Sequence, residues 1–198
     1  MARTRAKDHD AKRAEIMRIA ARTFAASGYH ATSMSAVAAE CGISKALVYH
    51  YYDGKEALLH DIIRTHLLKL IAAIDAVPAA PDPERRLHAL VSALLHAYQD
   101  ADAEHKVQLS AMEALPAAYR EDLVSLERRL VTVFADTIRA LKPDLFADRP
   151  LLKPVTMSLF GMLNWVYMWF RDGGPISRKD YADLATNLFV NGVRAMDQ

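Results

Sequence analysis

The chain has 198 residues and a formal net charge of +1, with 25 Lys and Arg against 24 Asp and Glu. Apolar residues make up 52% of it, enough for a substantial core in one or two small domains. The charge balance excludes a polybasic tail-type nucleic-acid binder and an acidic disordered segment. The one cysteine, Cys41, excludes a disulfide scaffold and fits a reducing compartment, so we expect a cytoplasmic protein.

The charge is distributed unevenly along the chain. Residues 1–60 hold nine Lys and Arg against six Asp and Glu, whereas residues 61–198 hold 16 against 18. The first segment therefore carries +3 and the second −2, which suggests a cationic head on a neutral-to-acidic body. At the N-terminus, Arg3, Arg5 and Lys7 would form either a flexible arm with salt-dependent affinity for a polyanion or a tail without a role.

Apolar residues recur with helical spacing through nearly the whole chain. In chain order the pattern predicts helices through residues 16–27, 33–40, 45–51, 59–74, 87–98, 102–115, 117–141, 154–170 and from 177 onward. No segment alternates with the two-residue period of a strand, so we predict an all-α fold of about nine helices. The longest uncharged run, within 154–170, falls short of the ~20 residues of a membrane span, and we expect a buried helix there and no membrane association.

The stretch from Ser33 to Lys55 has the features of a helix-turn-helix. Two short helices join at a turn containing Gly42 and pack on the first helix of the chain. The third helix would project polar, cationic and small apolar groups outward, a mixture that suits the major groove of DNA. An ordinary helical bundle has similar spacing, so the pattern alone leaves DNA binding and a structural role open.

The segment Ala11 to Leu59 also resembles the DNA-binding head of the TetR family of bacterial transcriptional regulators. The resemblance is carried by Phe24, Gly28, Tyr29, Thr32, Ser33, Val37, Ala38, Gly42, Ile43, Ser44, Val48, Tyr49, Tyr51, Tyr52, Lys55, Glu56 and Leu58. Cys41, Val37 and Tyr52 stand where the family usually has Ala, Ile and Phe. The resemblance implies a three-helix helix-turn-helix DNA-binding domain over residues 1–54 and a ligand-binding and dimerisation domain over residues 55–198.

Carried over by position, three residues of the third helix, Lys45, Ala46 and Leu47, would face the DNA bases. Leu47 stands where many members have Thr, so we expect contact with a thymine methyl instead of a base hydrogen bond. Phosphate or sugar contacts would come from Ser33, Ser35, Ser44, Tyr49, His50 and Lys55. A packing role for Tyr49 and a solvated side chain for His50 are the alternatives.

The resemblance further implies a homodimer, formed through the last two long helices, on a palindromic double-stranded DNA operator. The apolar run 154–170 and Leu184 and Leu188 of the final helix suit such a partner surface.

The body is also similar, more loosely, to the branch of the family that senses acyl-CoA thioesters, in Gly161 to Trp165 with Trp169-Phe170 and in Met112 to Pro116. This resemblance implies a repressor that an acyl-CoA effector releases, without a cofactor. Ligand contacts would come from Met112, Met162, Trp165 and Trp169, with Arg120 and Arg171 for the CoA phosphates. Core or interface packing and surface salt bridges are the alternatives for these residues, and another lipophilic or aromatic effector, as in control of drug efflux, is the alternative ligand.

Catalytic signatures are missing from the sequence: it has no His-Glu-x-x-His, no Cys-x-x-Cys and no Gly-rich phosphate loop. We therefore expect neither a catalytic nor a metal site. An all-helical ligand-binding enzyme is the remaining alternative.

Overall fold

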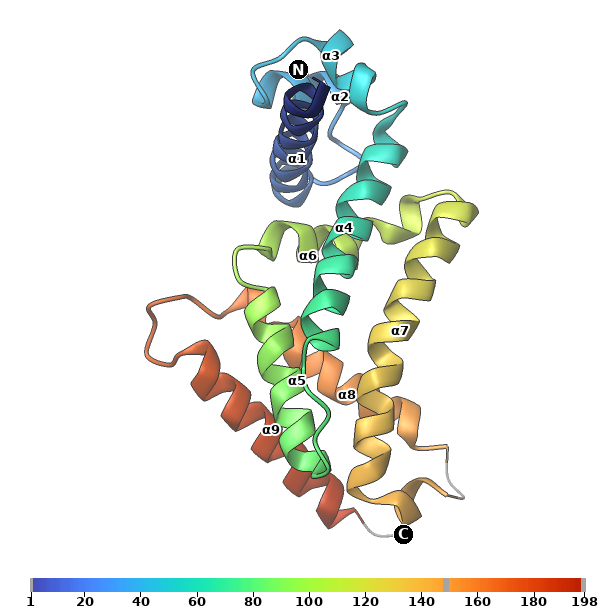
Figure 1. Ribbon diagram of the computed structural model, residues 1–198, viewed down its shortest axis with the longest axis vertical. Helices are drawn as coiled ribbons and strands as arrows, with labels where there is room; N and C mark the ends of the chain where they lie inside the picture. Colours follow the sequence, from blue (N-terminus) through green and yellow to red (C-terminus); the bar gives the residue numbers. More distant parts are fainter. Residues whose placement is uncertain (1, 148–149, 197–198) are drawn as a thin grey trace. The chain divides into compact units, whose positions relative to one another are not determined.

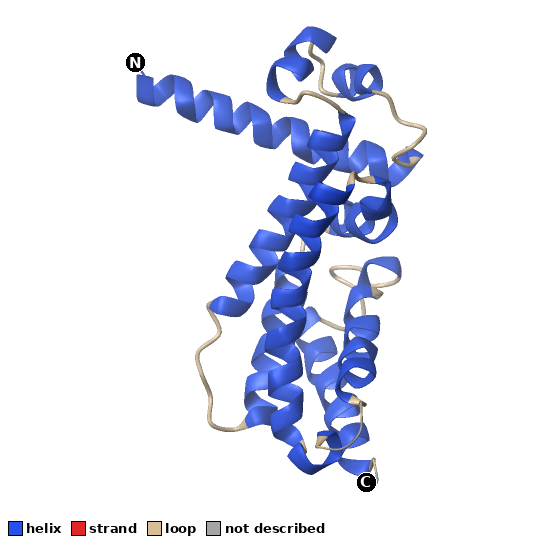
Figure 2. Cartoon of the chain, turned by 90° about the vertical axis from the view of Figure 1, so that its right-hand side faces the viewer, coloured by secondary structure: helices blue, strands red, loops and turns tan. Residues whose placement is uncertain are grey.

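The structure, a computed structural model, describes the backbone of residues 2–147 and 150–196 and the side chains from residue 8 onward within those ranges. In these residues it has nine α-helices, three short 3₁₀ helices and no strand (Figures 1 and 2). The bounds are α1 (Ala2–Ser27), α2 (Met34–Glu40), α3 (Lys45–Tyr51), α4 (Lys55–Asp75), α5 (Pro83–Ala97), α6 (Asp102–Ala111), η1 (Met112–Ala114), α7 (Ala117–Leu141), η2 (Pro143–Phe146), α8 (Leu152–Asn164), η3 (Val166–Met168) and α9 (Arg178–Ala195). The predicted all-α fold is confirmed. Helix α1 already begins at Ala2, so the flexible arm or tail predicted for Arg3, Arg5 and Lys7 is wrong for the backbone; their side chains lie outside the described residues.

Helices α1 and α2 end at the predicted turn glycines, and α2 and α3 begin at the predicted cap serines. Gly28 and Gly42 have φ of +84° and +63°, a left-handed conformation that a side chain would strain. The Ser33 and Ser44 hydroxyl oxygens accept hydrogen bonds from the backbone amides of Ala36 and Leu47, each at 3.1 Å. These caps satisfy amides that have no partner inside the helix, which is why two helices of only seven residues each have defined starts.

The single buried helix predicted over residues 154–170 is wrong in its second half. Helix α8 ends at Asn164, whose side-chain oxygen accepts a hydrogen bond of 2.8 Å from the Tyr98 hydroxyl. The chain then passes through η3, and Trp165 and Trp169 are exposed. A uniformly apolar run has no helical phase, so nothing in the sequence pattern indicated that the helix ends here.

The chain folds into two compact units that do not follow its linear order. The first unit takes residues 1–67 and 101–124, and the second takes residues 68–100 and 125–198. Helices α4 and α7 therefore each contribute to both units. None of the helices in the described ranges combines the length and the apolar character needed to cross a membrane.

In the first unit, α1 packs against α2 and α6, and α2 packs against α3 (Figure 1). Its core holds Ile16, Ala20, Val37, Val48 and Leu58, all fully buried. These are the apolar positions of the predicted helix faces, so burial of those faces holds the three N-terminal helices together.

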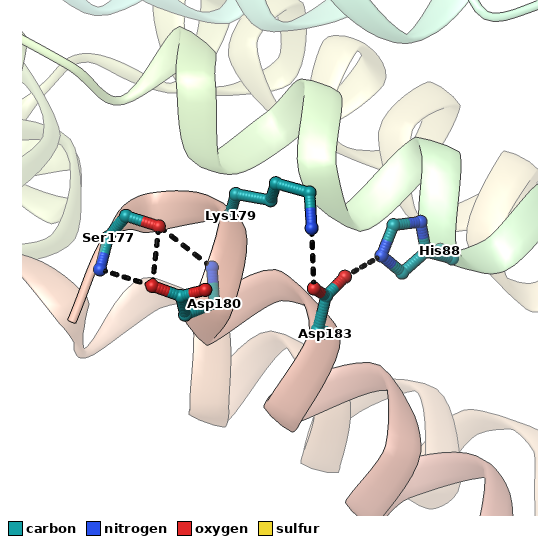
Figure 3. Close-up of polar contacts among 5 residues, drawn as sticks. All are labelled: His88, Ser177, Lys179, Asp180 and Asp183. Carbon is teal, nitrogen blue, oxygen red and sulfur yellow. Dashed lines mark hydrogen bonds and ion pairs between the residues drawn. The ribbon is translucent and has the colours of Figure 1, made fainter.

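In the second unit, α9 lies along α5 and also packs against α8 (Figure 1). A hydrogen bond of 2.5 Å joins His88 of α5 to Asp183 of α9, whose other oxygen pairs with Lys179 at 2.9 Å (Figure 3). The start of α9 is the predicted capping box: Ser177 and Asp180 each accept a hydrogen bond from the other's backbone amide (Figure 3). These contacts define where α9 begins and which of its faces meets α5.

Candidate nucleic-acid interface

Helix α3 presents one continuous exposed surface, which we call the α3 face: Lys45, Ala46, Leu47, Tyr49 and His50. Leu47 and Tyr49 are 37% and 43% exposed, values that are high for large apolar side chains. The Lys45 ammonium lies 5.7 Å from the centre of the Tyr49 ring, a cation–π distance. No acidic residue lies on this face. It therefore offers a cation, ring edges and small apolar groups, without the negative charge that would repel a phosphate backbone.

The opposite side of α3 is fixed to the core of the unit. Val48 is fully buried, and Tyr52, directly after the helix, is 5% exposed. The Tyr52 hydroxyl donates to Asp61 of α4 at 2.7 Å, and the same carboxylate pairs with Arg13 of α1 at 2.8 Å. Burial, reinforced by Asp61, raises the pKa of Tyr52, so its phenol stays a hydrogen-bond donor. This network ties the end of α3 to α1 and α4 and so orients the α3 face.

Of the serines predicted to contact the DNA backbone, Ser44 directly precedes the α3 face, and Ser33 and Ser35 lie at the start of α2, which packs against α3. Ser33, Ser35 and Ser44 are exposed. Ser33 and Ser44 use their oxygens as helix-cap acceptors, which leaves each hydroxyl proton available to a phosphate. Their exposure is compatible with the predicted backbone contacts, which stay predictions.

Lys55 has a contact set that the sequence did not predict. Its ammonium donates to the carbonyl oxygens of Tyr29 at 2.8 Å, Thr32 at 2.9 Å and, more weakly, His30 at 3.5 Å. It also lies 4.2 Å from the centre of the Tyr29 ring, and burial raises the pKa of that phenol to about 12. An ammonium has three protons, and these carbonyls take them. Lys55 therefore clamps the loop between α1 and α2, and a phosphate would have to compete with these bonds.

The residues predicted to bind an effector divide between the two units. Met112 of η1 and Arg120 of α7 belong to the first unit, where both are half-buried and Arg120 pairs with Glu113 at 3.4 Å. The other four, Met162, Trp165, Trp169 and Arg171, belong to the second unit. Trp165 and Trp169 are 58% and 47% exposed, and the Trp169 ring contacts Tyr181 edge-on at 5.0 Å. Exposure of this degree suits a protein-contact surface better than the lining of a closed pocket.

Sequence reasoning missed Arg13, Asp61 and the clamp role of Lys55, because these contacts join residues far apart in the chain. No local spacing relates Lys55 to Tyr29 or Arg13 to Asp61. The resemblance to the family marked Lys55 alone of these, because Arg13 is not among the residues that carry it and Asp61 lies beyond the segment.

Comparison with known families agrees with this geometry. Residues 16–62 match the family of bacterial regulatory proteins called the tetR family, and residues 80–193 match the tetracyclin repressor-like C-terminal domain. A helix-turn-helix with an exposed second helix, joined to this C-terminal domain, defines a ligand-responsive transcriptional regulator that binds DNA. The chain belongs to the TetR family. It is therefore a regulator and not an enzyme, as predicted.

Relatives cover nearly the full chain. The chain is 25% identical over 193 residues to the HTH-type transcriptional repressor KstR2 of Mycobacterium tuberculosis, spanning 93% of this chain and 94% of that protein. It is similar to the structure of a TetR-family transcriptional regulator from Bordetella parapertussis 12822, with 34% identity, a TM-score of 0.86 and coverage of 94% and 97%. AibR, in complex with isovaleryl coenzyme A and operator DNA, shares the fold with 22% identity, a TM-score of 0.75 and coverage of 89% and 97%.

Proposed function

We propose that this TetR-family regulator is a homodimeric repressor that binds a palindromic operator through the α3 face and leaves it when an acyl-CoA-type effector binds. The observation that carries the DNA contact is the exposure of Lys45, Leu47 and Tyr49 on a helix whose other side is anchored by Val48 and Tyr52. In this proposal residues 1–54 bind DNA, and residues 55–198 bind the ligand and the second subunit.

Within the α3 face we assign two kinds of contact. Lys45, Ala46 and Leu47 face base edges, with Leu47 against a thymine methyl, and Tyr49 and His50 contact the DNA backbone together with the serines. Lys55 supports the loop that holds these groups in place, through the carbonyl contacts described above.

The DNA contact is tested with a duplex that the wild-type protein selects from a random pool. We expect Lys45→Ala and Tyr49→Ala to abolish its retention in a gel shift while the oligomeric state stays unchanged. Lys69→Ala is the matched control, because Lys69 is exposed on α4 outside the α3 face. Retention of the duplex by both α3 variants would refute the assignment of this face.

The proposed dimer rests on an exposed apolar surface of α8, α9 and the segment between them. Its large members are Met157, Trp165, Met168, Trp169, Leu184 and Leu188, each at least 47% exposed. Exposed apolar groups of this size, on two helices that pack together and on the segment that joins them, mark a protein-contact surface. A two-fold dimer through it would present two α3 faces to one side of a duplex, with half-sites about one helical turn apart.

The dimer surface is tested by placing a charge on it. We expect Leu188→Glu to shift the protein from dimer to monomer in sedimentation at micromolar concentration and to abolish binding of the palindromic duplex. Leu109→Glu is the matched control, because Leu109 is a similarly exposed leucine, at 45%, on α6. An unchanged dimer in Leu188→Glu would refute the proposed surface.

The effector class has two supports of different kinds. The sequence resembles the acyl-CoA-sensing branch around Met162 and Met112, and AibR, which shares the fold, forms a complex with isovaleryl coenzyme A. We assign Met112 and Met162 to the acyl group, and Arg120 and Arg171 to the CoA phosphates. Binding would favour a body conformation in which the two α3 faces are misspaced for adjacent major grooves.

A panel of CoA thioesters of increasing chain length, with the matching free acids, tests this effector class. We expect a thioester, but not its acid, to raise the melting temperature and release the duplex, and Arg120→Ala to weaken that release. Release by the free acids or by unrelated lipophilic compounds alone would favour the alternative effector class.

A further inference from the structure

A cluster of three rings joins α1 to the end of α3. His9 of α1 lies 4.7 Å from the Tyr51 ring, tilted by 31°, and 6.4 Å from the His50 ring, at 81°. His50 and Tyr51 contact each other edge-on at 5.5 Å. We call His9, His50 and Tyr51 the ring cluster. It places a second imidazole, from a different helix, beside the end of the α3 face.

Both imidazoles of the ring cluster are open to solvent. His9 and His50 are exposed, the His9 side chain by 49%, whereas Tyr51 between them is half-buried and acts as the packing element. A strand of B-DNA carries one phosphate per ~3.4 Å of helix axis. The 6.4 Å between the two imidazole centres is close to the axial rise of two such steps, about 6.8 Å, so both rings can reach phosphates of one strand.

The charges around His9 make its protonation important for a polyanion. The Asp10 carboxylate lies 3.6 Å from its Nδ1, and Asp8 precedes it on α1. From α3 it faces His50 and Tyr51. On α1, Lys7 precedes it by two residues, with a side chain outside the described ones, and Lys12, three residues on, is paired with Glu15 at 2.8 Å. With a neutral imidazole, Asp8 and Asp10 flank the ring cluster with two carboxylates. A protonated imidazole neutralises one of them and adds a donor.

We infer that the DNA contact surface extends from α3 onto α1 through His9, and that His9 and His50 make DNA binding take up protons. The inference rests on the proposed DNA contact of the α3 face. Histidine is the side chain that changes charge between about pH 5 and 8. Phosphates favour the protonated imidazole, so the bound protein holds more protons than the free protein. By linkage, the affinity for DNA rises as the pH falls through this range.

The test is the dependence of DNA affinity on salt at two pH values, measured by fluorescence anisotropy with the full-length protein and the selected duplex. Each additional cation that neutralises a phosphate steepens the slope of log K against log salt by about 0.9. We expect the wild-type slope to be steeper at about pH 6 than at about pH 8, by up to about 1.8 for two imidazoles. His9→Gln and His50→Gln should each remove about half of this difference.

Two variants and a control keep the test decisive. His9→Phe keeps a ring against Tyr51 but cannot be protonated. It should therefore fold like the wild type and lose about half of the difference in salt slope between the two pH values. His9→Lys carries its charge at both pH values and should keep a steep slope at about pH 8. His96→Gln is the control, since His96 is exposed on α5 and bonds within its own helix, to the Ser92 carbonyl at 2.8 Å.

Two results would overturn the inference: a wild-type slope that does not change with pH, or a His9→Phe protein with the full wild-type difference. Either result leaves the proposed DNA contact intact if Tyr49→Ala still abolishes binding. Failure of the proposed function shows itself differently, as a Tyr49→Ala protein that binds the duplex as tightly as the wild type.

Discussion

Replacing Lys55 by methionine separates two roles for this residue. The substitution Lys55→Met keeps an unbranched side chain of similar length but removes the ammonium that donates to the carbonyls of Tyr29 and Thr32, so the side chain is no longer held in place. If the clamp is the main role, the variant is less stable. If a phosphate contact is the main role, the variant keeps its stability and loses DNA affinity.

The magnitude of the clamp follows from its contacts. The two short hydrogen bonds come from a charged donor and contribute about 1.5 kcal/mol each. The cation–π contact at 4.2 Å adds about 0.5–1 kcal/mol, and release of the lysine side chain returns about 1.5–2 kcal/mol of conformational entropy. We therefore expect Lys55→Met to lower the free energy of unfolding by about 2 kcal/mol.

The assay is urea unfolding followed by circular dichroism, with Lys69→Met as the matched control, because Lys69 is exposed. The salt dependence of DNA binding is measured on the same proteins. A Lys55→Met protein as stable as the control, with a salt slope shallower by about 0.9, would refute the clamp and restore the phosphate contact predicted from the sequence.

Three further outcomes concern the second unit. Ser177→Ala removes half of the capping box of α9 and should lower the free energy of unfolding by about 1 kcal/mol, measured in urea. The hydrogen bonds from the Ser177 amide and hydroxyl lower the pKa of Asp180 from its ordinary value of 3.8. The ionised Asp180 therefore contributes its full stabilisation above pH 3.8, and the protein loses this stabilisation as the pH falls below that value. An Asp180→Asn protein should therefore lose less stability between neutral pH and about pH 3 than the wild type, and an equal loss in thermal melts would contradict this. Tyr98→Phe removes the buried hydroxyl that donates to Asn164 and should cost about 1–2 kcal/mol, and an unchanged urea midpoint would show that this bond does not stabilise the end of α8.

Local signals in the sequence predicted the N-terminal helices and their ends. Gly28 and Gly42 adopt the left-handed conformation that made them turn residues, and Ser44 caps α3 as its side-chain chemistry predicts. The same reasoning placed Val48 inside and Tyr49 outside, because helical periodicity assigns each position to a face. The family followed from the order of these residues over the first third of the chain.

The sequence by itself therefore determined the helices of the DNA-reading segment, its exposed surface and the family, since these depend on contacts between residues a few positions apart. The tertiary structure decided what each polar side chain does there. It showed that Lys55 holds the Tyr29 carbonyl 26 residues away, that His9 lies against Tyr51, and that Trp165 follows the end of a helix instead of continuing it. Such contacts depend on how distant elements pack, and a near-neutral net charge carries no information about that packing.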